Sequence, residues 1–280
     1  MKKILITGDH SYIGESLSAY LSGFSGAYET EELCMIGDGW KEHSFEGYDA
    51  VVHVAGIAHI RETAENAHLY DEVNRALAIE TAKKAKEARV PQFILMSSMS
   101  VYGIDTGVIT RDTVPAPVSN YGKSKLAAEE GILPLKSKSF RVCVLRPPMV
   151  YGKGCKGNFQ SVIKLVEKLP AFPKLDNRRS MIHIDNLCGF IRLAVDRQID
   201  GIYFPQNRET MNTTEMAGWI AEALGKKFRR SGFLGFGVKL LMPFVKAAKK
   251  GFGSLVYRDL EDFDYCYCTK DSRESVISSV

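Results

Sequence analysis

The sequence predicts an α/β fold in which a doubly wound parallel sheet is accompanied by a smaller C-terminal lobe. Short aliphatic and β-branched runs alternate with segments whose apolar residues have helical spacing, and such alternation implies a parallel sheet covered on both faces. The run at residues 50–55 (AVVHVA) also lacks the polar and apolar alternation of a half-exposed strand. This is the pattern of a strand that is buried on both sides.

The expected elements follow in order along the chain. Strands are predicted at residues 3–7, 50–55, 92–96, 140–145 and 201–204, and helices at residues 12–21, 69–88, 124–133, 159–168, 186–195 and 214–224. A Thr-Thr-Glu sequence is expected to cap the last of these helices. The order predicts a dinucleotide-binding domain of the Rossmann type over residues 1–155, completed by about residues 181–205. Residues 156–180 and 206–280 are expected to form a substrate lobe.

The composition is typical of a folded globular protein. The 280 residues are 45% hydrophobic and 25% charged, and the net charge of +4 is spread along the chain, so neither disorder nor nucleic-acid binding is favoured. The six cysteines show no zinc-ligand spacing, and no export signal follows Met1. We therefore expect a cytoplasmic protein with reduced thiols and without a metal site.

The tail contains the longest apolar stretch of the chain, at residues 233–257. Lysines and a proline interrupt it, so stable membrane insertion is not expected. Its apolar and basic residues, Lys246 and Lys250 among them, predict a basic amphipathic helix. We expect this helix to pack on the substrate lobe or on a second subunit, and contact with anionic lipid is the alternative.

Two motifs carry the first indications of chemistry. Residues 7–14 (TGDHSYIG) lie where the first strand meets the first helix, and the backbone N–H groups and helix dipole at such a junction hold phosphate groups. Tyr121 and Lys125 are four residues apart on one helix face. An ammonium group lowers the pKa of a neighbouring phenol, from ~10 toward neutrality, and so favours its action as a general base. Either motif alone has a structural explanation, a tight turn or a solvated helix face.

Together these motifs belong to an ordered set of five segments, TGDHSYIG (7–14), DAVVHVAG (49–56), SSMSVYG (97–103), YGKSK (121–125) and RPPMVYG (146–152). With this set the chain resembles an extended short-chain dehydrogenase/reductase of the nucleotide-sugar epimerase/dehydratase type. The resemblance covers about residues 1–225. It implies a dinucleotide cofactor, a nucleotide-diphosphate sugar as substrate, and redox chemistry at one sugar carbon.

The resemblance also implies the site residues. It makes Tyr121 the base, and Ser98 the hydrogen-bonding partner of the reacting sugar oxygen. Lys125 matches the cation that also holds the nicotinamide ribose, and Asn74 the active-site asparagine. The expected cofactor-binding residues are Gly8, Ser11, Tyr12, Ile13, Gly14, Asp38, Val54, Ala55, Gly56, Tyr121, Lys125 and Pro147. The expected substrate-binding residues are Ser98, Asn158, Phe172 and Arg179. Outside the family pattern, Asn158 reads as a helix cap, Arg179 as a surface charge and Phe172 as core packing.

Two positions depart from the family pattern. Ser11 replaces the middle glycine of the phosphate-binding turn, which we expect to displace the phosphate outward. The acidic residue expected after the second strand has no clean match, and Asp38 is the nearest carboxylate. NAD is favoured by Asp38 and by the absence of a basic residue at 33–40, and NADP is left open. His53 is expected to pack or hydrogen-bond near the cofactor.

The predicted function is that of an NAD(P)-dependent nucleotide-sugar 4-epimerase, which acts by reversible hydride transfer through a 4-keto intermediate. The alternatives are a 4-keto-reductase or dehydrogenase and, from another class, a dinucleotide-sensing binding protein without catalysis. Dehydratase chemistry is not expected, because Met99 and Ser100 stand where related 4,6-dehydratases have Asp-Glu. A homodimer is one assembly that the sequence leaves open.

Overall fold

The computed structural model describes residues 1–280 except 59, 61, 243, 246–248, 250 and 261, so Lys246 and Lys250 of the expected basic helix lie outside the described residues. The chain forms two compact units. Unit 1 contains residues 1–103, 114–147 and 187–205, and unit 2 contains residues 104–113, 148–186 and 206–280.

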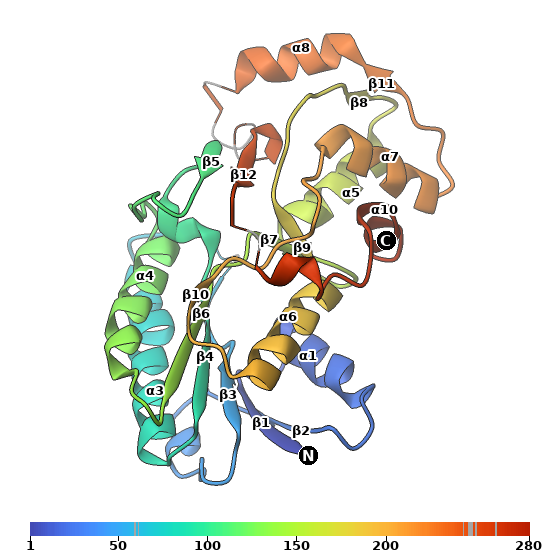
Figure 1. Ribbon diagram of the computed structural model, residues 1–280. Helices are drawn as coiled ribbons and strands as arrows, with labels where there is room; N and C mark the ends of the chain where they lie inside the picture. The colour runs from blue at the N-terminus through green and yellow to red at the C-terminus, as the bar shows by residue number, and fades with distance from the viewer. Residues whose placement is uncertain (59, 61, 243, 246–248, 250, 261) are drawn as a thin grey trace. The chain divides into compact units, whose positions relative to one another are not determined.

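Unit 1 is built on a six-stranded sheet with the order β10-β6-β4-β3-β1-β2, in which every neighbouring pair is parallel. The strands are β1 (Lys2–Thr7), β2 (Tyr28–Leu33), β3 (Ala50–His53), β4 (Gln92–Met96), β6 (Arg141–Leu145) and β10 (Gly201–Tyr203). In Figure 1, α3 (Leu77–Glu87) and α4 (Asn120–Ile132) cover one face, and α1 (Tyr12–Ser22) and α6 (Ile184–Arg197) the other. The predicted doubly wound α/β fold is confirmed.

The core between the sheet and α3 shows why these segments pack. Ala78, Ala82 and Ala85 recur at helical spacing on α3, and all three are fully buried. They face large strand residues such as Val51 and Phe93, which belong to the same buried cluster. Small helix residues allow a helix to approach the sheet closely, and large strand residues fill the remaining space.

Some helix boundaries differ from the prediction, and in two cases a side-chain cap decides where the helix begins. The helix predicted at 69–88 is divided into α2 (Ala67–Leu69), a π-helical stretch (Tyr70–Ala76) and α3. α4 begins earlier than expected because the Ser119 hydroxyl accepts a hydrogen bond from the backbone N–H of Gly122. α7 (Thr213–Ala223) is capped by Asn212 and not by the Thr-Thr-Glu sequence.

Unit 2 combines helices with three two-stranded parallel ladders, β5–β12, β7–β9 and β8–β11. Its elements are β5 (Gly107–Ile109), β7 (Met149–Tyr151), α5 (Asn158–Lys168), β8 (Phe172–Pro173), β9 (Met181–His183), α7, β11 (Arg230–Ser231), α8 (Gly232–Leu241), β12 (Leu255–Tyr257) and α10 (Ser272–Ile277). The observed division differs from the predicted domains. Strand pairing places residues 104–113, 148–155 and 181–186 in unit 2, because β5 pairs with β12 and β9 pairs with β7.

Short 3-10 turns connect the larger elements, at Gly39–Lys41, Met99–Tyr102, Leu133–Leu135 and Phe263–Tyr265. All six cysteines are free thiols. The part of the chain that the structure describes contains no helix long and apolar enough to cross a membrane. In the same residues, no three His, Cys, Asp or Glu side chains are grouped as metal ligands would be.

Candidate functional site

The turn between β1 and α1 meets the end of β3. Gly8 has a φ of +115°, and a Cβ added to it would lie 2.7 Å from the backbone nitrogen of Ala55. The Thr7 carbonyl accepts hydrogen bonds from the backbone N–H groups of Val54 (3.1 Å) and Ala55 (2.8 Å). Only glycine fits at this position, and the structure brings Gly8, Val54 and Ala55 together as expected for a dinucleotide turn.

Ser11 begins α1 and replaces the missing glycine with a cap. Its hydroxyl donates to the Gly8 carbonyl (2.6 Å) and accepts from the Gly14 backbone N–H (3.2 Å). A Cβ added to Gly14 would lie 2.6 Å from that hydroxyl oxygen. Tyr12 and Ile13 therefore form the first turn of a capped helix directly after a glycine turn, which is a site that fits a phosphate group. The displacement of the phosphate by Ser11 stays a prediction.

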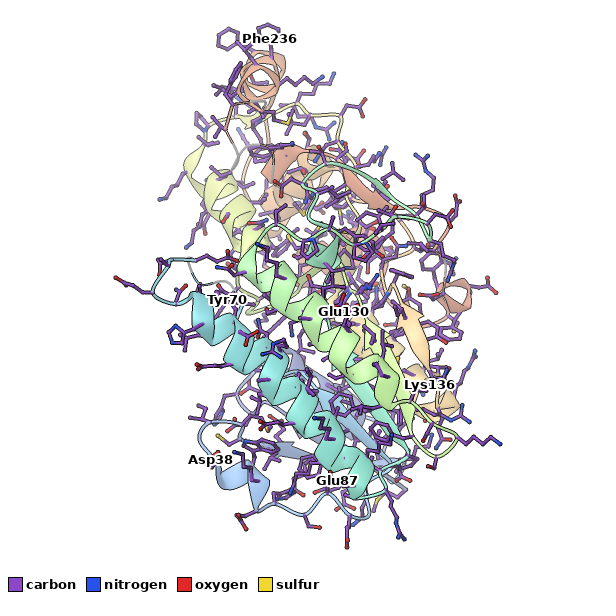
Figure 2. All side chains as sticks on the ribbon, turned by 90° about the vertical axis from the view of Figure 1, so that its left-hand side faces the viewer. Asp38, Tyr70, Glu87, Glu130, Lys136 and Phe236 are labelled. Atoms are coloured by element: carbon purple, nitrogen blue, oxygen red, sulfur yellow. The ribbon has the colours of Figure 1, made fainter. Side chains whose placement is uncertain are left out.

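Asp38 lies apart from the end of the second strand. β2 ends at Leu33, whose carbonyl accepts hydrogen bonds from the backbone N–H groups of Gly8 (2.9 Å) and Asp9 (3.3 Å). Asp38 is five positions further along and exposed (Figure 2), and its carboxylate forms an ion pair with Lys41 at 2.7 Å. Its contact with an adenosine ribose stays a prediction.

Ser98 and Tyr121 meet at the carboxyl end of β4. Ser98 follows that strand, and its hydroxyl accepts from the backbone N–H of Ser100 at 3.1 Å. The start of α4 packs closely on the same turn, because a Cβ added to Gly122 would lie 2.5 Å from the Ser100 carbonyl oxygen. As a result, the Ser98 hydroxyl lies near enough to the Tyr121 phenol to lower its pKa. The structure thus brings together two residues that the resemblance implies for the active site.

The electrostatic environment of Tyr121 corrects one expectation. Burial raises the pKa of Tyr121, the nearby Ser98 hydroxyl lowers it, and the nearby Tyr70 raises it. Lys125 was expected to lower this pKa, but its ammonium group instead donates to the Met96 carbonyl at 2.9 Å. In the protein alone, Ser98 is therefore the group that favours the phenolate.

Lys125 is a buried cation, with only 4% of its surface exposed. Burial lowers its pKa to about 8, and the carboxylate of Glu129 acts in the opposite direction. A Cβ added to Gly56 would lie 3.2 Å from the Lys125 Nζ and 2.8 Å from the Asn74 Oδ1. Gly56, Lys125 and Asn74 are therefore brought together beside the ends of β3 and β4.

Asn74 holds the backbone in place. Its amide oxygen accepts from the Ile57 N–H (2.8 Å), and its amide nitrogen donates to the Ile57 carbonyl (3.1 Å) and to the Ser124 hydroxyl (3.1 Å). The side chain is fully buried. These contacts assign Asn74 a positioning role for the segment after β3, and its expected contact with the reacting groups stays a prediction.

A buried charge pair supports this arrangement, and the sequence reasoning missed it. Glu129 and Arg146 form a bidentate ion pair, with their closest atoms 2.5 Å apart. Ser97 also donates to Glu129, and Arg146 donates to the Tyr102 hydroxyl at 2.8 Å. The sequence signal that could have drawn attention to Glu129 is its spacing of four residues from Lys125, which places both on one helix face.

Two further predicted site residues, His53 and Pro147, make hydrogen bonds or packing contacts within unit 1. The His53 Nδ1 lies 2.7 Å from the Thr7 hydroxyl, and its ring stacks on Phe93 with centroids 5.9 Å apart. Burial lowers the pKa of His53 to about 3, so the ring is neutral. The Pro147 carbonyl accepts from the Met99 N–H at 2.9 Å and ties the turn after β4 to the end of β6.

Ser98 belongs to unit 1, and the other three predicted substrate residues belong to unit 2. Asn158 is the exposed first residue of α5 and follows Gly157, whose φ is +99°. Arg179 is partly buried, and its guanidinium donates to the Gly253 carbonyl at 2.6 Å. Burial lowers the pKa of Arg179, and the nearby Asp105 raises it.

Phe172, the third of these residues, packs inside unit 2. Its ring is 2% exposed and lies against Phe228 and Phe252, with centroid distances of 6.2 and 6.4 Å. The structure therefore shows a packing role, and contact with a nucleotide base stays a prediction. Leu169 is the exposed apolar residue of the same segment, at 39%.

Comparison with known proteins adds to this geometry. Residues 4–203 match the family described as "NAD dependent epimerase/dehydratase family". The chain belongs to this family. The resemblance inferred from the five ordered motifs is thus confirmed, and the dinucleotide turn and the Ser98–Tyr121 pair described above lie within the matched residues.

Two relatives illustrate the family's range. The chain is 34% identical to a UDP-glucose 4-epimerase from Vibrio cholerae over 251 residues, which are 80% of this chain and 76% of that protein. It is 25% identical to the N-acetyl-alpha-D-glucosaminyl-diphospho-ditrans,octacis-undecaprenol 4-epimerase of Escherichia coli O157:H7 over 207 residues, or 70% and 62% of the two chains.

Solved structures agree with the fold. The UDP-glucuronic acid 4-epimerase from Bacillus cereus, in complex with NAD, superimposes with a TM-score of 0.74 at 18% identity and covers 99% of this chain and 96% of its own. A dTDP-4-dehydrorhamnose reductase from Clostridium acetobutylicum gives a TM-score of 0.75 at 18% identity, with coverage of 99% and 98%. The family fold therefore hosts both epimerases and reductases.

Proposed function

We propose that the protein is an NAD-dependent nucleotide-sugar 4-epimerase that acts through a 4-keto intermediate. The observation that carries this proposal is the closeness of the Ser98 hydroxyl to the Tyr121 phenol, with the buried Lys125 on the same helix as Tyr121. The family match and the 34% identity to a UDP-glucose 4-epimerase support it. This set of side chains is what proton removal from a sugar hydroxyl requires.

The cofactor site fits a dinucleotide, because a side chain at Gly8 or Gly56 would fill the space beside the strand ends. Gly8 and the N-terminus of α1 would hold the phosphates, and Lys125 the nicotinamide ribose. When bound, NAD supplies a reversible hydride acceptor. NAD is proposed over NADP because residues 33–40 contain Asp38 and no basic residue.

The protein's own residues handle the proton. Once the Tyr121 phenol has released its own proton to solvent, the phenolate accepts the proton of the sugar hydroxyl, and Ser98 donates a hydrogen bond to the oxygen as it becomes a carbonyl. Since burial raises the pKa of Tyr121, the phenol is protonated in the resting protein, and stabilisation of the phenolate is the step that the site must provide. Return of that proton from Tyr121 completes the reaction with either configuration at carbon 4.

The substrate side rests on Asn158 and Arg179, whose amide and guanidinium groups suit the diphosphate of a nucleotide sugar. We place the enzyme in the cytoplasm, which agrees with its six free thiols. A homodimer stays a prediction that light scattering tests.

The test begins with purified protein and no added cofactor. We expect denaturation to release NAD, and incubation with UDP-glucose to yield UDP-galactose. Tyr121→Phe should lower kcat by about 10²–10⁴-fold and retain NAD. The control Tyr28→Phe, which removes a hydroxyl bonded to Asp196, should keep full activity. Protein that is free of cofactor and consumes NADPH with a 4-keto sugar would show a reductase instead, and unchanged biological activity of Tyr121→Phe would indicate a dinucleotide sensor.

A further inference from the structure

Helix α8 of unit 2 exposes an apolar face. Phe233, Phe236 and Leu240 are 85%, 67% and 61% exposed, and their spacing of three and four residues places them on one side of the helix. Leu241 (53%) flanks this side, and Phe244 (83%) follows the helix. Figure 2 shows the Phe236 side chain at the outer side of this helix, away from the strands. Large aromatic side chains are rarely left in water at this density.

The opposite side of α8 packs against the segment that follows β8. Gly235 is buried, and a Cβ added to it would lie 2.2 Å from the Lys174 carbonyl oxygen, directly after β8. Ser231 caps the helix by accepting from the Leu234 N–H at 3.2 Å. Because this side of the capped helix packs against backbone, the side that carries Phe233, Phe236 and Leu240 faces outward.

The segment of the sequence that contains α8 is strongly basic. Residues 223–258 contain nine Lys or Arg and no Asp or Glu, so this segment carries +9 while the whole chain carries +4. The rest of the chain therefore has a net charge of −5. The exposed cations among the described residues of the segment include Lys226, Lys227, Arg229, Arg230, Lys239 and Lys249.

We infer that α8 and its flanking basic residues bind the surface of an anionic phospholipid bilayer. The apolar face enters the boundary between headgroups and acyl chains, and the cations lie among the lipid phosphates. A symmetric contact between two copies through this face would bring two such basic segments together, which like-charge repulsion disfavours. Binding is peripheral, in agreement with the finding that no described helix is suited to cross a membrane.

Vesicle flotation of the full-length protein tests this inference. We expect the protein to float with phosphatidylcholine vesicles that contain about one-third phosphatidylglycerol, and not with pure phosphatidylcholine. Raising NaCl from about 0.05 M to about 0.5 M should weaken the binding, because the Debye length shortens. Phe233→Ser with Phe236→Ser should weaken it at least about tenfold. Arg229→Gln with Arg230→Gln should weaken it as well.

Matched controls use exposed residues of unit 1. Val114→Ser removes an apolar side chain that is 79% exposed, and Lys83→Gln with Lys138→Gln removes two exposed cations. Both should bind vesicles as the wild type does, and far-UV circular dichroism confirms that every variant is folded. Failure of the wild type to float, equal flotation with neutral vesicles, or unchanged binding of the double phenylalanine variant would overturn the inference. So would conversion of a wild-type dimer to a monomer by that variant, because α8 would then be the interface between copies.

Discussion

Replacing Lys125 with methionine should change both the pH dependence of the free energy of unfolding and the activity of this protein. In the folded protein, burial lowers the pKa of Lys125 from 10.5 to about 8. One pH unit of such a difference corresponds to about 1.36 kcal/mol, so keeping this ammonium group charged in the folded state costs about 3 kcal/mol. We propose that this cost is tolerated because the Lys125 ammonium holds the nicotinamide ribose.

The sign of the pH dependence follows from proton binding. Between pH 8 and 10.5 the unfolded chain holds the Lys125 proton and the folded chain does not. The free energy of unfolding of the wild type should therefore rise, relative to Lys125→Met, by about 2–3 kcal/mol from about pH 7 to about pH 10. Below pH 8 both states are protonated, and the difference between the two proteins should be constant.

Urea denaturation of cofactor-free protein at a series of pH values measures this difference. Lys123→Met, an exposed lysine on the same helix, is the control and should parallel the wild type. We also expect Lys125→Met to lose both NAD retention and activity. Wild-type turnover in this variant would show that Lys125 takes no part in the mechanism. A difference between wild type and Lys125→Met that does not change with pH would refute the reasoning, since Lys125 would not then be a buried charge.

Three other predictions concern the scaffold of the site, and urea denaturation checks each. Gly8→Ala should lower the free energy of unfolding by about 2–4 kcal/mol and abolish NAD retention, because the added Cβ would lie 2.7 Å from backbone. The control Gly26→Ala, at a φ of +73° with open space around it, should lower it by about 1–2 kcal/mol. Glu129→Gln should lower the free energy of unfolding by about 3–5 kcal/mol, because it removes the buried carboxylate that pairs with the Arg146 guanidinium, and adding Arg146→Met should recover most of it; no recovery would contradict the ion-pair argument. Asn74→Ala should cost about 1–3 kcal/mol and speed amide exchange after β3; unchanged exchange would argue against the positioning role.

Local patterns were sufficient for much of the fold. Buried runs such as residues 92–96 predicted β4 at its observed bounds, and helical spacing located α5 to within one residue. Both signals are contained in a few neighbouring residues, because strand and helix periodicities are properties of the backbone. Helix starts were less accurate, since the choice between neighbouring capping residues, such as Asn212 over Thr213, depends on the packing of the whole turn.

The sequence by itself determined the parallel α/β architecture and the order of the five motifs, which identified the family. Only the tertiary structure decided what surrounds them. The ion pair of Glu129 with Arg146 and the contact of Asn74 with Ser124 join residues 17 and 50 positions apart, and no local periodicity encodes such contacts. The same reason explains the Lys125 result: the spacing of four residues puts Lys125 on the helix face of Tyr121, but only the packing against β4 decides that its ammonium group donates to the Met96 carbonyl.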